Sequence, residues 1–380
     1  MTHRQRFLRT MHFQPVDRVP DWEFGYWDDT LVDWHEQGLP REIDTLRKAD
    51  VYFGFDPTGD IPTATGLLPE FEYKVIEQRG EQLLIQDENG TTSLRHASGR
   101  SSIPHFLDFA LKGREEWELE FEPRLDSDDP RRRPDAEEWK ELEARYAGRD
   151  YPLGMYIGGL YGTMRNWMGF ERAAMMLHDD PGLVEEIMEL LTQIVLNNIA
   201  SIPPGVEVDF ASGWEDMCFN KGSMISPADF DRLMVPRYHR ITEALKPHGC
   251  DIAYIDCDGN INQLVSLWLK GGINGMFPVE VAAGSDPLVL REKYGRQVLL
   301  FGGVNKRALA QGKEGIRKEL ARIAPVVREG GWIPHVDHRV PPDVTFENYL
   351  YYLKLKRDTF GIPEPQPWEE RRPADWGPPA

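Results

Sequence analysis

Two carboxylates and a thiol end an apolar run in the segment Tyr254-Ile-Asp-Cys-Asp-Gly-Asn260. Asp256 and Asp258 alternate with Cys257, so in an extended chain the two carboxylates lie on one face. Gly259 and Asn260 then turn the chain towards the next helix. Two carboxylates at the end of a buried strand are costly unless that end opens into a solvated site. We therefore predict an active site here, with carboxyl groups placed to exchange protons.

Further polar residues follow apolar runs elsewhere in the second half of the chain. Crowded carboxylates raise one another's pKa, and histidines act as general acids, general bases or metal ligands. Any one of these residues could equally be a capping or salt-bridging group, but together they favour one active site. The set comprises Glu215, Asp216, Asp256, Asp258, Glu280, Lys306, His335, Asp337 and His338.

The elements that must position these residues alternate between helix and strand from Tyr151 onwards. Such alternation predicts a parallel sheet with helical crossovers. Because a nucleotide-type glycine loop is missing, we predict closure into a (β/α)8 barrel, whose strand ends converge on one face. The predicted strands are 153–157, 206–211, 251–256, 275–280, 298–302 and 332–338, and the predicted helices include 181–199 and 313–327.

The first part of the chain departs from this alternation. An amphipathic helix over 2–11 opens extra N-terminal helical structure. Short strands near 74–78, 83–86 and 91–95 predict an antiparallel β-meander, within an insertion of about 72–140. We predict one barrel domain over 1–362 and a Pro/Trp-rich tail over 363–380.

Composition excludes several classes of partner. The formal net charge of −19 argues against nucleic acid and anionic membranes. No apolar run reaches membrane-spanning length, and the N-terminus lacks the apolar core of a signal peptide. The three cysteines form neither a CxxC pair nor a disulfide framework, which favours the cytoplasm.

Several segments together resemble the uroporphyrinogen decarboxylase superfamily. They are Arg4-Gln-Arg-Phe-Leu8, Pro15-Val-Asp-Arg-Val-Pro20, Met168-Gly-Phe-Glu171, Tyr254–Asn260, Gly272–Glu280, Tyr294-Gly295, Gly302–Lys306 and Gly330–Asp343. The resemblance covers nearly the whole chain apart from the meander and the tail, and it implies the same (β/α)8 barrel.

This superfamily includes true decarboxylases, whose N-terminal motif Met-Arg-Gln-Ala-Gly-Arg grips the carboxylates of a tetrapyrrole. At the equivalent place this chain has Asp21-Trp-Glu-Phe-Gly-Tyr-Trp27. Acids and aromatics replace the cationic side chains that a polycarboxylate needs. The decarboxylase interpretation is therefore disfavoured, though it remains the alternative.

The other branch comprises cobalamin-dependent methyltransferases, which move a methyl group between a small molecule and a corrinoid protein. Their thiol-using members carry a zinc site, whose ligands fall here on Asp256, Asp258 and His338. All three ligand types are changed. Two carboxylates and an imidazole are harder metal ligands, in the acid–base sense, than the thiolates of the family site. Glu215, Asp258 and His338 remain candidate ligands of Zn²⁺ or another divalent ion.

The resemblance implies roles for the remaining residues. Asp256, Asp258, His338 or Glu215 would protonate the alkoxide, phenoxide or amine that demethylation leaves. Trp22, Tyr26, Trp27 and Tyr161 would stack on a flat substrate, and Arg165 or Lys306 would hold an anionic end. Glu280 and His335 complete the predicted substrate site. Core packing for the aromatics and a structural salt bridge for Arg165 remain open.

We therefore expect a corrinoid-dependent methyltransferase that uses cobalamin through a separate corrinoid protein. Its methyl donor or acceptor would be a methoxylated or methylamino compound, or a pterin. The alternatives are a decarboxylase-type carboxy-lyase and a catalytically silent barrel that docks a corrinoid protein. The resemblance also allows a homodimer.

Overall fold

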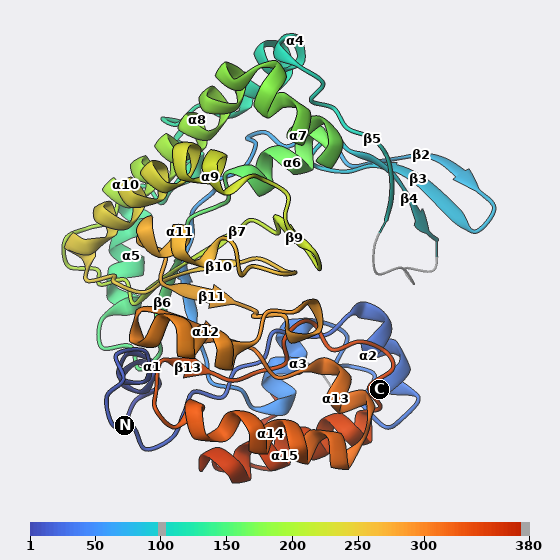
Figure 1. Ribbon diagram of the computed structural model, residues 1–380, viewed down its shortest axis with the longest axis vertical. Coiled ribbons are helices and arrows are strands. Elements are labelled where there is room, and N and C mark those ends of the chain that lie inside the picture. The colour runs from blue at the N-terminus through green and yellow to red at the C-terminus, as the bar shows by residue number, and fades with distance from the viewer. Residues whose placement is uncertain (98–103, 374–380) are drawn as a thin grey trace. The chain divides into compact units, whose positions relative to one another are not determined.

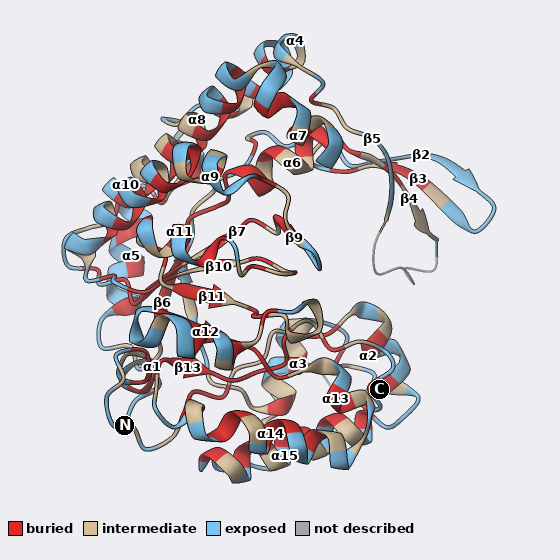
Figure 2. Cartoon of the chain, in the orientation of Figure 1, coloured by how far each residue is buried: buried red, intermediate tan, exposed pale blue. Residues whose placement is uncertain are grey.

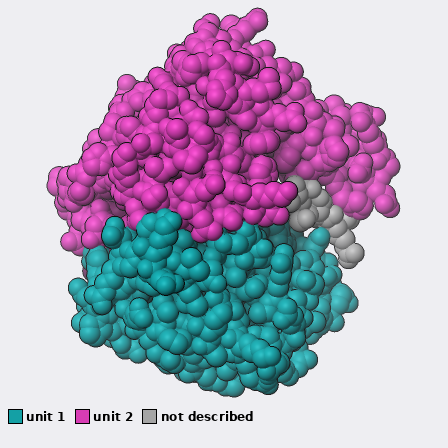
Figure 3. All heavy atoms as spheres, viewed as in Figure 1, with its two compact units in different colours: residues 1–57, 276–380 teal, residues 58–275 magenta. Residues whose placement is uncertain are grey.

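The computed structural model describes residues 1–97 and 104–373. The chain forms two compact units, coloured separately in Figure 3. Unit 1 contains Met1–Pro57 and Met276–Ala380, and unit 2 contains Thr58–Gly275. The last residues of the predicted tail, 374–380, lie outside the described residues.

The parallel strands confirm the predicted fold class, α/β with the strand order of a (β/α) barrel (Figure 1). They follow one another in chain order as β1 (Gly59–Ile61), β6 (Leu153–Tyr156), β7 (Phe210–Trp214), β10 (Ala253–Asp256), β11 (Gly275–Phe277), β12 (Leu299–Phe301) and β13 (Trp332–Ile333). In unit 2, β6 pairs in parallel with β1 and β7, and β7 pairs with β10. In unit 1, β12 pairs in parallel with β13.

Three strands differ most from their predicted bounds, and the one predicted over 332–338 ends at Ile333. The strand predicted over 206–211 starts at Phe210, because the Asp209 carboxylate accepts a hydrogen bond from Leu153 N and pairs with Arg149 before the ladder begins. The strand predicted over 275–280 ends at Phe277, since Pro278 has no N–H to continue a ladder.

Helices cover the strands of unit 2 and bury their apolar faces, as the red and pale blue sides of the ribbon in Figure 2 show. Asp180 caps the longest of these helices by accepting a hydrogen bond from Leu183 N. The helices are α4 (Arg114–Glu116), α5 (Ala136–Tyr146), α6 (Tyr161–Met168), α7 (Phe170–Asp179), α8 (Pro181–Ala200), α9 (Pro227–Leu233), α10 (Val235–Leu245) and α11 (Val265–Lys270).

Unit 1 combines the N-terminal helices with the C-terminal ones. The predicted extra N-terminal helices are present, and Phe7 and Met11 of the first are buried. The helices are α1 (His3–Met11), α2 (Asp28–His35), α3 (Leu46–Phe53), α12 (Pro287–Tyr294), α13 (Lys306–Ala310), α14 (Lys313–Val327), α15 (Phe346–Phe360) and α16 (Trp368–Arg371). The described part of the tail packs on α3, since Arg371 donates to the carbonyls of Val51 and Tyr52.

The predicted meander is confirmed and contains one strand more than expected. Its antiparallel strands run in the order β2 (Lys74–Arg79), β3 (Gln82–Gln86), β4 (Thr92–His96) and β5 (His105–Asp108). Gly80 and Gly90 make the turns with positive φ, as glycine readily does. A two-stranded hairpin of β8 (Cys218–Phe219) and β9 (Gly222–Ser223) follows β7. Among the described residues, no helix is long and apolar enough to span a bilayer.

Candidate functional site

The carboxylates at the end of β10 lie as the alternation predicts. Asp256 and Asp258 are partly exposed, whereas Cys257 between them is buried. The backbone N–H of Glu215 donates to the Asp256 carbonyl at 2.9 Å, which joins the ends of β7 and β10. Gly259, with φ of 87°, lets the loop approach the β8–β9 hairpin, because a Cβ there would lie 2.6 Å from the Cys218 carbonyl oxygen. Unit 2 therefore presents two carboxyl groups from one strand end.

Glu215, predicted as an acid and metal ligand, is a buried positioning residue. Its side chain is 0% exposed, and its two oxygens accept hydrogen bonds from Leu160 N (2.7 Å) and Gly162 N (2.6 Å). The Tyr238 hydroxyl also donates to this carboxylate. Burial raises the pKa of Glu215, and these hydrogen bonds oppose the rise. Through these hydrogen bonds Glu215 fixes the first turn of α6.

Two glycines at the start of α6, Gly159 just before it and Gly162 within its first turn, allow this close contact. A Cβ at Gly159 would lie 1.9 Å from the Trp214 carbonyl oxygen, and one at Gly162 would lie 2.2 Å from that of Glu215. Only glycine fits at either position without a backbone shift. The segment Gly158-Gly-Leu-Tyr-Gly162 therefore serves close packing of α6 on the end of β7.

Arg165, predicted to hold a substrate anion, is already paired within unit 2. Its Nη2 lies 3.1 Å from an oxygen of Asp216, and its guanidinium carbon lies 5.4 Å from the centre of the Trp214 ring. Asp216 has φ of 40°, an unusual conformation for a residue with a Cβ. Tyr161, predicted to stack on substrate, is fully buried in the core.

Tyr156, at the end of β6, was missed by the sequence analysis. It is 40% exposed, although it ends a strand whose other residues are buried. The pKa of Tyr156 is raised to about 12. The main cause is desolvation of its hydroxyl, and the negative charges of Glu215 and Asp256 add to it. Tyr156 is therefore a protonated phenol close to the carboxylates of unit 2. An aromatic residue at the carboxyl end of a predicted strand was the available signal.

In unit 1, Lys306 and Glu280 form an ion pair, so neither is an isolated charge. Lys306 Nζ lies 2.6 Å from the Glu280 carboxylate, and both side chains are mostly buried. Asp337, which is fully buried, accepts hydrogen bonds from Lys306 N (2.8 Å) and Ala282 N (3.2 Å). Burial raises the pKa of Asp337 to about 6. This arrangement ties together the loops that follow β11, β12 and β13.

The two histidines of this region have different environments. His335 is buried, its Nδ1 lies 2.9 Å from the Val336 carbonyl oxygen, and burial lowers its pKa to about 3. It is therefore neutral at physiological pH. His338 is partly exposed and stacks on Trp27, with ring centroids 5.3 Å apart and planes inclined by 28°.

Partly exposed side chains form an aromatic wall in unit 1, which we define as Phe24, Trp27, Phe277, His338 and Arg339. Phe24 makes edge contacts with Phe277 (4.7 Å between centroids) and His338 (5.7 Å). The Arg339 guanidinium carbon lies 5.5 Å from the Trp27 ring centre and 5.9 Å from that of Phe24. Of these five, the sequence predictions included only Trp27 and His338.

Two aromatic residues predicted to meet substrate make packing contacts within unit 1. Tyr26 is fully buried, and its hydroxyl lies 2.8 Å from that of Tyr349. Trp22 stacks on Phe7 (5.2 Å between centroids) and on Phe301 (6.4 Å). Periodicity alone did not separate these residues from Trp27, because all three lie within one short irregular segment.

The acids of the same segment are buried in ion pairs. Glu23 lies 2.7 Å from Lys356 Nζ and accepts a hydrogen bond from the Tyr352 hydroxyl. Asp21 pairs with Lys356 (3.0 Å) and Arg357 (2.9 Å). These carboxylates anchor the N-terminal segment on α15 and are not directed at a ligand.

The metal site that the family resemblance implied draws on Glu215 and Asp258 of unit 2 and on His338 of unit 1. Within the described part of either unit, no three His, Cys, Asp or Glu side chains come together as a metal set. Glu215 accepts backbone hydrogen bonds through both of its oxygens, as described above. We assign no step to zinc.

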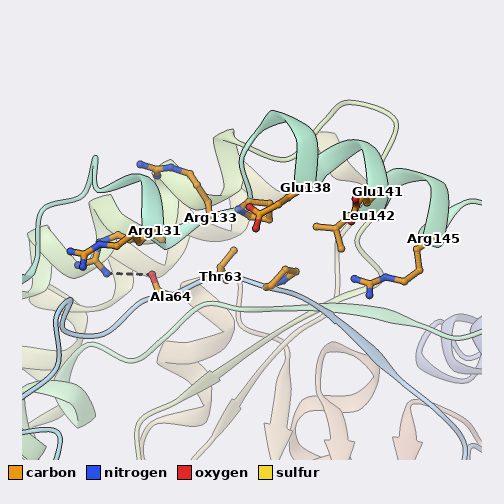
Figure 4. A pocket seen from close by; sticks show the side chains of 11 residues that line it. Thr63, Ala64, Arg131, Arg133, Glu138, Glu141, Leu142 and Arg145 are labelled. Carbon is orange, nitrogen blue, oxygen red and sulfur yellow. Dashed lines mark hydrogen bonds between the residues drawn. The ribbon is translucent and has the colours of Figure 1, made fainter. Parts of the chain in front are cut away.

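A separate hollow of about 650 Å³ lies in unit 2, between α5 and the residues that follow β1 (Figure 4). Glu138, Glu141 and Arg145 of α5 line one side, and Thr63 lines the other. The predicted site residues do not line this hollow. Buried Arg132 donates to the carbonyls of Asp126, Gly66 and Arg124 there, so much of the lining holds the turn before α5 in place.

Comparisons with known proteins agree with this fold. A methyltransferase from Methanosarcina mazei has a similar structure, with 16% identity, a TM-score of 0.57, and coverage of 94% of this chain and 98% of that one. At this identity the likeness shows the fold alone. A B12-independent methionine synthase from Shewanella sp. W3-18-1 matches with 13% identity and a TM-score of 0.35, over 60% of this chain and 68% of the other.

No curated protein matches the sequence. Residues 123–358, more than half of the chain, match the family described as uroporphyrinogen decarboxylase (URO-D). The chain belongs to the uroporphyrinogen decarboxylase family.

Proposed function

We propose that this protein is a methyltransferase acting between a small molecule and a corrinoid protein. The small molecule would be a methoxylated or methylamino compound, or a pterin. Family membership and the fold shared with a Methanosarcina methyltransferase support an enzyme of this kind. The corrinoid would be cobalamin, carried by the partner protein.

The observation that carries this proposal is the aromatic wall. Two of its members, Phe24 and Trp27, belong to the segment Asp21-Trp-Glu-Phe-Gly-Tyr-Trp27. A decarboxylase would need cations here to hold the carboxylates of its tetrapyrrole. In this segment Asp21 and Glu23 form ion pairs with Lys356, whereas Phe24 and Trp27 are partly exposed. Aromatic faces of this type suit a flat, largely apolar donor rather than a polyanion.

The corrinoid would supply the nucleophile that takes the methyl group. The part of this chain is to hold the donor and to protonate the oxygen or nitrogen that loses its methyl group. Asp256 and Asp258, partly exposed at the end of β10, are the proposed proton donors in unit 2. His338 is the proposed donor in unit 1, where it forms part of the wall that would hold the substrate.

The test mixes the purified protein with reduced cobalamin and a panel of methoxylated aromatics, methylamines and methyltetrahydrofolate. We expect methylcobalamin to appear in ultraviolet-visible spectra with one class of donor. Asp258→Asn should reduce the rate at least tenfold. Asp251→Asn, the same substitution on the exposed residue that precedes β10, is the matched control and should leave the rate unchanged.

Two alternatives give different results in the same preparation. Release of carbon dioxide from a porphyrinogen, without methylcobalamin, would support a decarboxylase and contradict the proposal. Binding of a corrinoid protein without turnover of any donor would indicate a catalytically silent barrel.

A further inference from the structure

We infer that Arg339 is an anion-binding residue and that the substrate is a flat aromatic compound carrying a carboxylate. This inference rests on the proposed function, whose substrate class it narrows. It arises because the cations expected to hold an anionic end, Arg165 and Lys306, are both engaged with carboxylates. A cation that has no carboxylate partner among the described residues, Arg339, lies on the aromatic wall.

The wall brings a guanidinium and aromatic faces to one partly exposed surface of unit 1. Arg339 lies within 6 Å of the rings of Phe24 and Trp27, the range of a cation–π contact. Such contacts restrain the side chain without using its N–H donors. A guanidinium held in this way still has two parallel N–H donors, which can bind a carboxylate through two hydrogen bonds.

The charge balance distinguishes Arg339 from Lys306 and Lys356 of unit 1. Lys306 is neutralised by Glu280, and Lys356 by Glu23 and Asp21. Among residues 1–97 and 104–373, no carboxylate forms an ion pair with Arg339. In a chain with a net charge of −19, a cation without its own carboxylate is where an anionic ligand is best accommodated.

Ring stacking and charge would then select different parts of one ligand. Trp27 and His338 are nearly parallel, and Phe24 and Phe277 meet edge to face, so a planar ring can join this packing. A carboxylate on that ring would meet Arg339. A neutral ring of the same size would keep the stacking and lose only the charge-assisted hydrogen bonds.

The test measures binding, not catalysis, so it needs no corrinoid. Affinities for benzoate and 4-methoxybenzoate are compared with those for methoxybenzene and 4-methoxybenzyl alcohol by isothermal titration calorimetry. We expect the wild-type protein to bind both carboxylates. Arg339→Gln should weaken their binding by about tenfold or more and leave the neutral compounds within about twofold. Arg339→Lys should restore part of the loss, because it keeps the charge but not the fork.

Arg296→Gln is the matched control, since Arg296 also lies over an aromatic ring, that of Phe13 at 5.1 Å, away from the wall. Thermal unfolding of each variant identifies any that misfolds. Added salt gives a second measurement on the wild type, where benzoate affinity should fall and methoxybenzene affinity should not.

The inference is overturned if the wild type does not bind benzoate, or if Arg339→Gln leaves benzoate affinity unchanged. Equal weakening of charged and neutral ligands would also overturn it. Arg339-dependent benzoate binding without methylcobalamin formation from any donor would contradict the proposed function and leave the anion site intact.

Discussion

His335 is a buried imidazole whose environment makes folding sensitive to acid. Its pKa falls from an ordinary 6.5 to about 3 because burial disfavours the charged ring. Below pH 6.5 the unfolded chain takes up a proton that the folded chain takes up only near pH 3. The stability that the neutral ring contributes is therefore present above pH 6.5 and lost as pH falls towards 3.

We expect this loss to be about 1.4 kcal/mol for each pH unit within that window. Urea unfolding between pH 7 and pH 4.5 should show the slope in the wild type and a shallower one in His335→Gln. His239→Gln, at an exposed position of α10, is the matched control. Identical slopes for the wild type and His335→Gln would refute the assignment.

Asp337 has the opposite pH dependence. Burial raises its pKa from 3.8 to about 6, so the folded state resists losing this proton. Its contribution is therefore fully present below pH 3.8 and is lost as pH rises through 6. We expect Asp337→Asn to gain up to about 3 kcal/mol of stability relative to wild type between pH 4 and pH 8. A stability difference that does not change with pH would show that the carboxyl group titrates normally.

At the scale of elements, Glu215 determines how α6 begins. Glu215→Ala would leave the buried N–H groups of Leu160 and Gly162 without their acceptor, at about 1–3 kcal/mol each. We expect a total loss of about 2–5 kcal/mol in the free energy of unfolding, measured with urea. Glu189→Ala, at a position of α8 where the side chain is 46% exposed, should change it by less than about 1 kcal/mol. A folded, fully stable Glu215→Ala protein that lacked activity would instead indicate a catalytic carboxylate.

At the scale of the whole molecule, a buried lysine joins segments more than 330 residues apart in unit 1. Lys356 of α15 is 0% exposed and contacts Asp21, Glu23 and the Trp22 carbonyl. Lys356→Met would leave two carboxylates buried with less compensation. We expect a loss of about 3–5 kcal/mol, measured by equilibrium unfolding.

Lys354→Met is the matched control, since Lys354 lies on the same helix with its side chain 64% exposed. It should change stability by less than about 1 kcal/mol. The double variant Lys356→Met/Glu23→Gln should lose less than the sum of its single changes, because one unpaired charge is removed with its partner. Strict additivity would mean that the pair does not interact.

Local patterns along the sequence were sufficient to predict the alternation of helices and strands after Tyr151, but not β1, β5 or the β8–β9 hairpin. Apolar runs, capping residues and turn glycines follow from covalent geometry, and the family motifs agreed with them. The same geometry placed Asp256 and Asp258 on one face and Cys257 on the other, and in the structure both carboxylates are partly exposed and Cys257 is buried. The side-chain period of a strand requires no knowledge of distant residues.

Only the tertiary structure decided which charges are already satisfied. Arg165 pairs with Asp216 from 51 residues away, and Lys306 with Glu280 from 26 residues away, whereas Arg339 faces aromatic rings. Burial likewise separated Glu215 and Tyr26 from the partly exposed Asp258 and Trp27. The physical reason is that ion pairing and desolvation depend on the distance between side chains in space. Sequence spacing does not fix that distance once the chain leaves a helix or strand.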